Sequence, residues 1–268
     1  SKPDKRLITY PCTLAQSEYA TPQDIEIIGD FAFGKCYDLA SVTIPDSVTE
    51  IGSYNFVNCP KLTKLVLPGN IKTIGPNSFG NPVKVFCDYN SKTAKNMSAA
   101  GLAFYDKNDN DAKFRLIYLE DGKTLALYQY TGTGATTAVD DIPADVQYIY
   151  PNAFRGNTTV TSIILPNAVT GIGADAFYGC TALTKIMLLS ANVSNISDNA
   201  FRNCNAAIFC DYRNPTAKKL SAIGHPFYNA SECEPNPPKF ALLYREDGKT
   251  LALIESTGTE TGAAAGID

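Results

Sequence analysis

The segment IGDFAFGKCYDLASVTIPDSVTEIG (residues 28–52) decides the fold, because its motif returns along the chain at a nearly constant interval. The motif is I-G-x-x-x-F-x-x-C-x-x-L-x-x-I-x-I-P, and its second half alternates apolar and polar residues as a half-buried strand does. Three apolar residues are expected to point inward and two polar residues outward, namely Leu39, Val42 and Ile44 against Ser41 and Thr43. One such unit cannot bury its apolar face alone, so stacked copies are expected to form a continuous core.

Six copies of this motif stand in two runs of three. The isoleucine that opens each copy occurs, in chain order, at Ile28, Ile51, Ile74, Ile149, Ile172 and Ile196. The steps within each run are 23 or 24 residues, a period typical of a solenoid in which every repeat forms one coil. Gly29, Gly52 and Gly173 follow this isoleucine, and we expect each at a tight turn that needs unusual backbone angles.

A longer repeat is superimposed on the short one. FCDYNSKTAKNMSAAGLAFYD (86–106) reappears as FCDYRNPTAKKLSAIGHPFYN (209–229), and YLEDGKTLALYQYTGTG (118–134) reappears as YREDGKTLALIESTGTE (244–260). The Asp-Gly pairs in the second element predict β-hairpins. In the first element, residues 93–100 and 216–222 are rich in helix formers and precede a glycine that can end a helix, Gly101 or Gly224.

Each large unit therefore combines a hairpin, about three short repeats and a closing helix. We divide the chain into a first block with its closing helix (1–113), a second block that opens with its hairpin (114–239), and the truncated start of a third unit (240–268). The expected class is a leucine-rich-repeat solenoid, α/β by convention and dominated by strands and loops. The third unit breaks off, which suggests a piece of a longer tandem array.

Composition narrows the function. The 268 residues carry a formal net charge of −4, with 19% charged and 44% hydrophobic residues, so general disorder is excluded and no basic surface for nucleic acid is expected. No apolar run approaches the ~20 residues that span a bilayer, so we expect no membrane insertion in this segment. The chain has one histidine and no tryptophan, which excludes a histidine-rich metal site.

The residues at 28–52 resemble the BspA-type leucine-rich repeats of bacterial surface proteins, which also occur in some parasitic protists. The connection LITYPCTLAQSEYATPQDIEIIGDFAF (7–33) and the closing TAKNMSAAGLAF (93–104) are similar to that family as well, so the resemblance covers nearly the whole chain. It implies a secreted or surface-anchored solenoid without enzymatic activity that serves adhesion to host proteins or cell–cell contact. Some members are described as binding fibronectin or fibrinogen.

Catalytic and metal-binding motifs are absent from the sequence. His225 stands where the first block has Leu102, so it belongs to no repeated site. The string DKNDND (106–111) begins like a calcium loop but has Asp111 where glycine is needed and Ile117 where glutamate is needed. We therefore expect no enzyme, no cofactor and no metal, and interpret residues 106–111 as a solvated linker.

The eight cysteines fit repeat positions better than a disulfide framework. One repeat position holds four of them, which we predict to be buried free thiols: Cys36, Cys59, Cys180 and Cys204. Cys87 and Cys210 are equivalent positions in the two closing segments. Cys12 and Cys233 have no repeat equivalent, and their redox state is left open.

The outward side of the strands is the candidate surface for a partner. Its central column and flanking positions consist of Ser41, Thr43, Lys64, Val66, Ser162, Ile164, Lys185 and Met187. No aromatic residue is expected in this column, and the same residues could simply be strand formers without a binding role. A rival contact surface is formed by tyrosines of the hairpins and neighbouring segments, namely Tyr118, Tyr128, Tyr130, Tyr148 and Tyr150.

Together these observations predict a monomeric, extracellular or cell-surface module that binds a host matrix or cell-surface protein through a rigid repeated surface. Nucleic acid is not an expected partner. The alternative is a structural spacer or stalk segment of a longer tandem-repeat surface protein. A binder would lose affinity when outward strand residues are changed, whereas a spacer would not.

Overall fold

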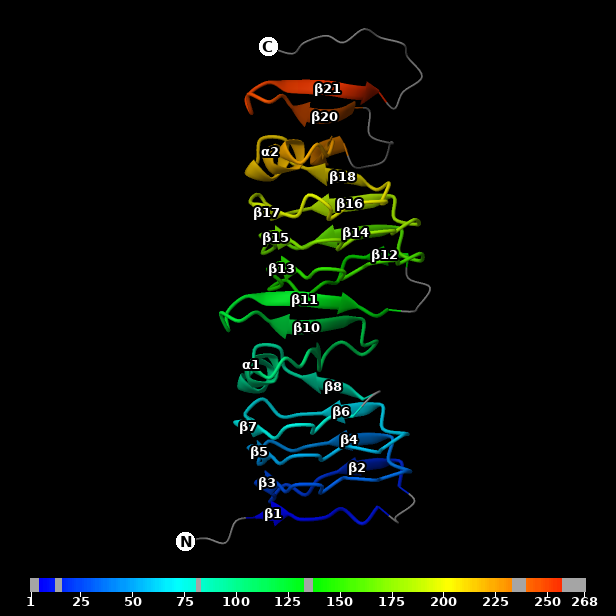
Figure 1. Cartoon of the computed structure of the whole chain (residues 1–268), viewed down its shortest axis with the longest axis vertical. Helices are drawn as coiled ribbons and strands as arrows, with labels where there is room; N and C mark the ends of the chain where they lie inside the picture. The colour runs from blue at the N-terminus through cyan, green and yellow to red at the C-terminus, as the bar shows by residue number, and fades with distance from the viewer. Residues whose placement is uncertain (1–4, 13–15, 81–82, 133–136, 233–239, 257–268) are drawn as a thin grey trace. The chain divides into compact units, whose positions relative to one another are not determined.

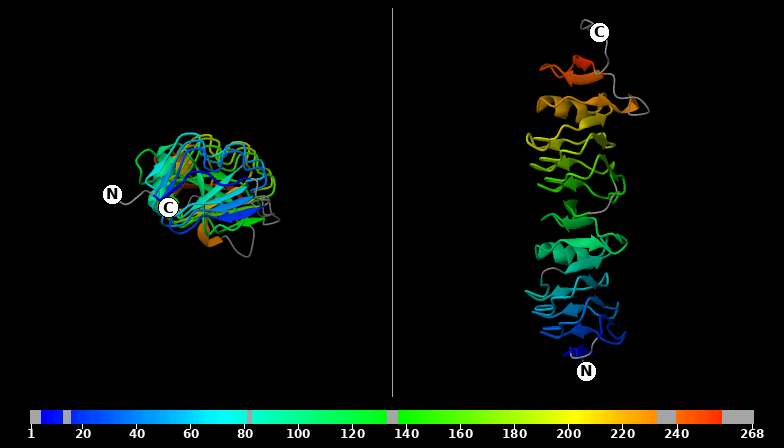
Figure 2. Two further views of the ribbon diagram at one scale, coloured as in Figure 1. Left: turned by 90° about the horizontal axis from the view of Figure 1, so that it is seen from below. Right: turned by 90° about the vertical axis from the view of Figure 1, so that its right-hand side faces the viewer.

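The computed structural model describes residues 5–12, 16–80, 83–132, 137–232 and 240–256 (Figure 1). The chain divides into two compact units, Ser1–Lys123 and Thr124–Asp268, and each is described by itself. In both units short parallel strands stack coil on coil, as the 23-residue period predicts (Figures 1 and 2). The expected leucine-rich-repeat solenoid, dominated by strands and loops, is confirmed.

The described residues of unit one form two strand ladders and one helix. The narrow ladder consists of parallel β1 (Arg6–Leu7), β3 (Ile27–Ile28), β5 (Glu50–Ile51) and β7 (Thr73–Ile74). The wide ladder consists of parallel β2 (Glu18–Ala20), β4 (Ser41–Thr43), β6 (Lys64–Val66), β8 (Lys84–Cys87) and β9 (Phe104–Asp106), followed by antiparallel β10 (Phe114–Tyr118). Helix α1 (Lys92–Ala99) lies between β8 and β9 in the chain.

Unit two repeats this plan. Its first ladder is β11 (Leu125–Tyr130), β13 (Tyr148–Ile149), β15 (Gly171–Ile172) and β17 (Asn195–Ile196). Its second is β12 (Ala138–Val139), β14 (Ser162–Leu165), β16 (Lys185–Leu188), β18 (Ala207–Cys210) and β19 (Tyr228–Asn229). Helix α2 (Pro215–Ala222), a 3-10 turn (Ala230–Glu232) and the antiparallel hairpin β20 (Phe240–Tyr244) and β21 (Leu251–Ser256) complete it.

Aromatic rings run through the core of each unit. Phe33 stacks on Phe56 with ring centroids 5.0 Å apart, and Phe154 stacks on Phe177 at 5.2 Å. Leu39, Val42 and Ile44 are buried while Thr43 is exposed, as the alternation predicts. One phenylalanine per coil therefore places an equivalent ring above the last, and the period of the sequence becomes a continuous apolar column.

The repeat glycines do not adopt the unusual angles that the sequence suggests. Gly29, Gly52 and Gly173 lie outside the left-handed region, so that prediction is wrong. A Cβ on Gly52 would come within 2.7 Å of the backbone nitrogen of Asp30 in the preceding coil. The glycine is needed because adjacent coils approach closely there. Positive φ falls instead on the residue two positions later in five coils, namely Phe31, Tyr54, Asn77, Asn152 and Asp175.

Both predicted helices are present. In α1 the Ser91 Oγ accepts a hydrogen bond from the Ala94 backbone nitrogen at 3.1 Å, and α2 opens with a proline. Gly101 and Gly224 both take φ near +73°, the conformation that ends a helix without steric cost. The glycine-terminated closing helices are therefore confirmed.

One cysteine prediction needs correction. Cys36 forms a disulfide with Cys12 across 4.7 Å between Cα atoms, whereas the repeat pattern predicts a free thiol at Cys36. The Tyr10 ring stacks on that of Phe33, so Cys12 comes one residue earlier in its coil than Cys36 does. The two cysteines therefore do not occupy one repeat position, as Cys36 and Cys59 do. Cys59, Cys180 and Cys204 are free as predicted, Cys204 being only partly buried, and Cys233 lies outside the described residues.

Candidate functional site

The strand register brings the predicted surface residues together within each unit. In unit one Ser41 pairs with Lys64, and Thr43 pairs with Val66, across β4 and β6. In unit two Ser162 pairs with Lys185, and Ile164 pairs with Met187, across β14 and β16. Each unit therefore carries two adjacent outward columns, which together we call its strand face. The polar column contains Ser41 and Lys64 or Ser162 and Lys185, and the central column contains Thr43 and Val66 or Ile164 and Met187.

The two strand faces differ in chemistry. In unit one, Thr43 and Lys64 are exposed, and the exposed Lys84 follows Lys64 in the same column. In unit two, Ile164 and Met187 are half-buried and Ala207 takes the place of Lys84. The unit-one face thus carries two lysines and, in the same column, Glu18, whereas the unit-two face carries Lys185 beside an apolar central column.

Aromatic residues do line the central column, contrary to the sequence analysis. The register continues from Val66 to Phe86 and Tyr105 in unit one. In unit two it continues from Met187 to Phe209 and Tyr228. These aromatics stand in the closing segments outside the 23-residue motif, so the spacing did not place them in the column; the repeated FCDY string was the available signal.

The aromatic rings of unit one present little free surface. Phe86 is only 6% exposed because it packs with Tyr105 and Ala112, and Val66 lies against the same cluster. The Lys64 Nζ lies 5.4 Å from the centroid of the Phe86 ring. Lys84 and Tyr105 make a similar contact at 5.5 Å. The side chains of this face that a partner can reach are therefore Thr43, Lys64 and Lys84. The buried rings of Phe86 and Tyr105 support the two lysines.

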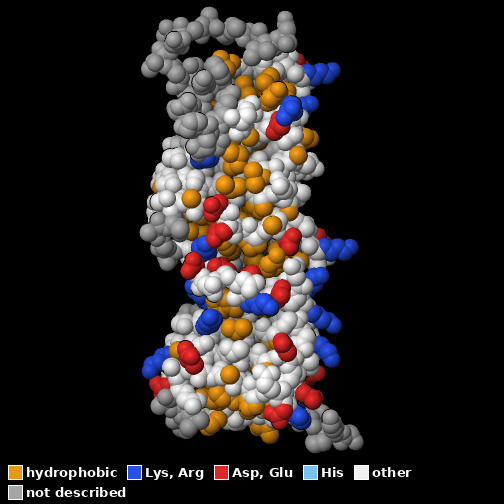
Figure 3. Space-filling view, turned by 180° about the vertical axis from the view of Figure 1, so that it is seen from behind, with side chains coloured by type: hydrophobic (Ala, Val, Ile, Leu, Met, Phe, Trp, Pro, Cys, Tyr) orange, Lys and Arg blue, Asp and Glu red, His pale blue; other side chains and the backbone are white. Residues whose placement is uncertain are grey.

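On the face drawn in Figure 3, hydrophobic side chains lie among residues of both charge signs. No single sign covers the part of that face drawn in colour.

The tyrosines proposed as a rival surface separate into two groups. Tyr118 and Tyr130 are buried, and the Tyr118 hydroxyl donates a hydrogen bond to the Tyr89 carbonyl at 3.1 Å. Tyr128, Tyr148 and Tyr150 are half-buried, with ring centroids of Tyr128 and Tyr150 5.1 Å apart. Burial, with a smaller contribution from Tyr150, raises the pKa of Tyr148. Three tyrosines of unit two therefore remain as an aromatic cluster.

His225 and Asp106, the residues considered for catalysis or metal binding, lie in different parts of the chain and have different neighbours. The His225 ring packs edge-on against Phe201 at 5.2 Å. Asp106 is buried, its pKa is raised by burial, and Asp88 beside it forms an ion pair with Lys107 at 3.3 Å. Among the residues that the structure describes, no three His, Cys, Asp or Glu side chains are grouped so as to hold a metal ion.

The buried thiols are held in their protonated form. Burial raises the pKa of Cys87 and of Cys210 to about 12, and that of Cys180 to about 11. A thiol nucleophile needs the opposite shift, towards a stable thiolate. These cysteines are core residues.

Within the described residues no helix is both long enough and apolar enough to cross a membrane, since α1 and α2 each have eight residues.

The family model for the BspA type leucine rich repeat region matches six copies in this chain, over residues 10–96 and 124–228. These matches span more than half of the chain, which therefore belongs to the BspA-type leucine-rich repeat family. The resemblance found in the sequence is confirmed. No protein in the search of curated proteins matches.

Three solved structures illustrate the similarity. A leucine rich cell surface protein from Faecalibacterium prausnitzii is 23% identical (76% of this chain and 54% of that chain; TM-score 0.35). A leucine-rich repeat protein from Bacteroides ovatus is 24% identical (72% and 55%; TM-score 0.36). The pneumococcal vaccine antigen PcpA is 20% identical (72% and 50%; TM-score 0.32). This chain thus spans about half the length of each.

Proposed function

We propose that this chain is a non-enzymatic interaction module of an extracellular or cell-surface protein, monomeric and binding a host matrix or cell-surface protein. The observation that carries the proposal is the pair of aligned outward columns in each unit. A rigid strand ladder holds these side chains in fixed positions, so little conformational entropy is lost on binding. The surface location is supported by family membership and by the name of the Faecalibacterium relative.

The two different strand faces favour binding over simple spacing. A spacer needs only coils that stack, and its outward residues are free to be any strand former. Here the polar column of unit one holds Lys64 and Lys84 against aromatic rings. In unit two that column holds Lys185 and lies beside Ile164 and Met187. Two chemically distinct contacts on one chain can add their free energies when both engage one partner.

The test screens the purified chain against immobilised extracellular matrix proteins, including fibronectin and fibrinogen. Variants on the strand faces are Thr43→Glu/Lys64→Glu in unit one and Ile164→Glu/Met187→Glu in unit two. The control Lys72→Glu/Lys123→Glu changes exposed lysines away from these columns. Binding that falls at least about tenfold in a face variant, but not in the control, supports the proposal.

Circular dichroism and thermal melts of every variant ensure that lost binding is not lost folding. Saturable binding that is unchanged in both face variants would show that the binding site lies outside the strand faces. Absence of binding to the whole panel by the wild-type chain would favour the spacer function.

A further inference from the structure

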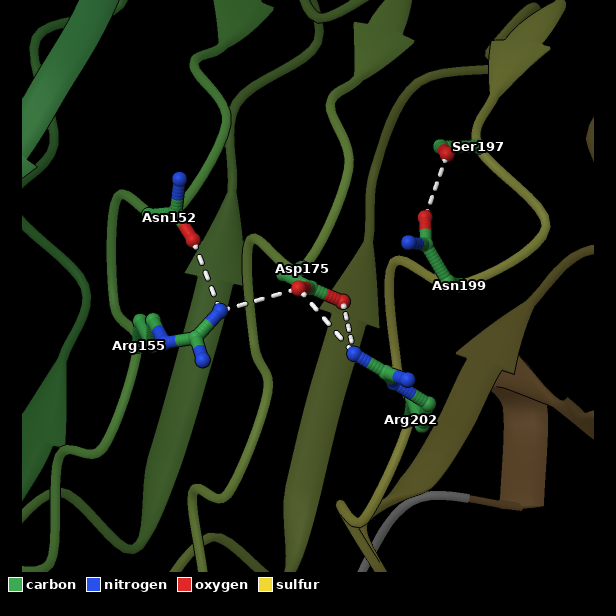
Figure 4. A network of polar contacts seen from close by, with 6 residues as sticks. All are labelled: Asn152, Arg155, Asp175, Ser197, Asn199 and Arg202. Carbon is green, nitrogen blue, oxygen red and sulfur yellow. Dashed lines mark hydrogen bonds and ion pairs between the residues drawn. The ribbon is translucent and has the colours of Figure 1, made fainter.

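A second charged surface lies in unit two, outside its strand face. Arg155, Tyr178 and Arg202 each follow the core phenylalanine of their coil, and Asp175 stands between the two arginines (Figure 4). We call these four residues the arginine ladder. The equivalent positions in unit one hold Gly34, Val57 and Gly80, which build the same coil without any charge. The repeat fold therefore does not require the arginine ladder.

The two guanidinium groups are held in place from two sides. The Cζ atoms of Arg155 and Arg202 lie 4.4 Å and 4.8 Å from the centroid of the Tyr178 ring. Arg155 Nη1 donates to Asp175 Oδ2 at 2.9 Å, and Arg202 Nη2 donates to the same carboxylate at 3.3 Å (Figure 4). Stacking and ion pairing together fix two flexible side chains before any ligand arrives, which lowers the entropy lost on binding.

The arginine ladder retains an outward positive charge. The arginine side chains are 47% and 56% exposed, while that of Asp175 is 15% exposed. Each guanidinium has five N–H donors and directs one of its nitrogens to Asp175, so the rest of each fork is directed elsewhere (Figure 4). An approaching ligand thus meets two cations, with the carboxylate beneath them.

The spacing of the charges defines the ligand. Arg155 and Arg202 donate to one carboxylate oxygen, Asp175 Oδ2, over 2.9 Å and 3.3 Å, so their donating nitrogens are no further apart than the sum of these two distances. Planar guanidinium forks recognise carboxylate, sulfate and phosphate oxygens in pairs. The fitting ligand carries at least two such anionic groups within a similar distance of each other.

The backbone here excludes an added peptide strand. The Asn152, Phe154 and Gly156 nitrogens donate to carbonyls of the next coil, at Ala174, Ala176 and Tyr178, over 2.8–3.0 Å. Recognition must then come from side chains, which suits a semi-rigid polyanionic chain better than an extended peptide that relies on main-chain bonds. We infer that the arginine ladder of unit two binds a sulfated, glycosaminoglycan-type polysaccharide.

Isothermal titration with a heparin-derived octasaccharide tests this inference on the full chain. Arg155→Gln/Arg202→Gln is expected to weaken binding at least tenfold, because two charge-assisted contacts are lost. Arg155→Lys/Arg202→Lys keeps the charge but loses the planar forks, and is expected to fall between. The control Lys72→Gln/Lys123→Gln removes two exposed charges in unit one and should change the affinity less than about twofold.

Melting temperatures check that each variant is folded. If Arg155→Gln/Arg202→Gln does not fold, Arg155→Lys/Arg202→Lys still tests the role of the guanidinium groups. Wild-type affinity should fall on raising the salt from about 50 to 200 mM. No binding by the wild-type chain, or equal binding by the glutamine pair, would overturn the inference. An oligoglutamate peptide of equal charge that binds more tightly would overturn the choice of a glycan.

Discussion

At single positions, the repeat is governed by how closely neighbouring coils approach. Gly52 and Gly75 are glycines because a Cβ there would come within 2.5–2.8 Å of backbone atoms in the previous coil. The left-handed backbone falls two residues later, where unit two has Asn152 and Asp175, residue types that tolerate it. Unit one places Phe31 and Tyr54 there, stacked at 5.1 Å and exposed.

Substituting Gly52 with alanine is therefore expected to be costly. A Cβ collides with the Asp30 nitrogen at 2.7 Å and the Gly29 carbonyl carbon at 2.8 Å, and backbone cannot move aside locally. We expect a loss of about 2–4 kcal/mol in the free energy of unfolding, measured by urea denaturation. The control Gly101→Ala meets no atom within 4 Å and should cost only the ~1 kcal/mol of its positive φ. Equal costs would refute the close-approach explanation.

At the level of elements, one buried threonine ties each closing helix to the coil beside it. Thr93 Oγ1 donates to the Pro68 carbonyl at 2.5 Å and accepts from the Ile71 nitrogen at 2.9 Å. Thr216 makes the equivalent bonds in unit two, to the Ser190 carbonyl and from the Val193 nitrogen. Both threonines are fully buried, so each hydroxyl satisfies two backbone groups that water cannot reach.

Replacing Thr93 with valine should keep the shape and lose both bonds. The orphaned carbonyl and N–H are each expensive when buried, so unit one should be destabilised by about 2–4 kcal/mol. Thr93→Ser retains the hydroxyl and should cost about 1 kcal/mol. Hydrogen exchange on α1 amides provides the measurement; protection that stays equal in the valine and serine variants would argue against this role.

The elements also show where sequence reasoning succeeds. A fixed period, an alternating strand and an Asp-Gly or glycine stop are local signals, so the coils, the closing helices and the β20–β21 hairpin follow from them. The aromatic residues Phe86 and Phe209 enter the strand face through pairing between coils, and the spacing did not place them there. The Cys12–Cys36 bond likewise joins a repeat position to a cysteine that has no repeat equivalent. Contacts made by residues outside the 23-residue motif therefore do not follow from the period and are seen only in the folded structure.

For the molecule as a whole, the burial of cysteine thiols and tyrosine hydroxyls makes the free energy of unfolding depend on pH in the alkaline range. Burial raises the pKa of Cys87 and Cys210 from about 9 to about 12, and it also raises the pKa of Tyr19 and Tyr148. The folded chain keeps these protons while the unfolded chain loses them. The stabilisation is therefore complete below the unfolded pKa and is lost as the pH rises towards the folded one.

We therefore expect the free energy of unfolding to fall steadily between pH 9 and pH 12, with little change from these groups between pH 6 and pH 8. Urea titrations across that range measure it. The double variant Cys87→Ala/Cys210→Ala should show a shallower decline, because two of the coupled protons are removed. An unchanged slope would mean that these thiols titrate alike in both states.

The disulfide at the start of unit one has a mechanical consequence. Cys12 and Cys36 are 24 residues apart in sequence, and the bond closes the intervening chain into a covalent loop. A pulling force applied through the ends of the chain would bypass that loop, and about 80 Å of contour length would stay hidden at ~3.4 Å per residue. Load would then fall on the later coils, where Cys59, Cys180 and Cys204 carry no such bond. Under such a force, the coil closed by the disulfide is expected to stay closed while the later coils unfold.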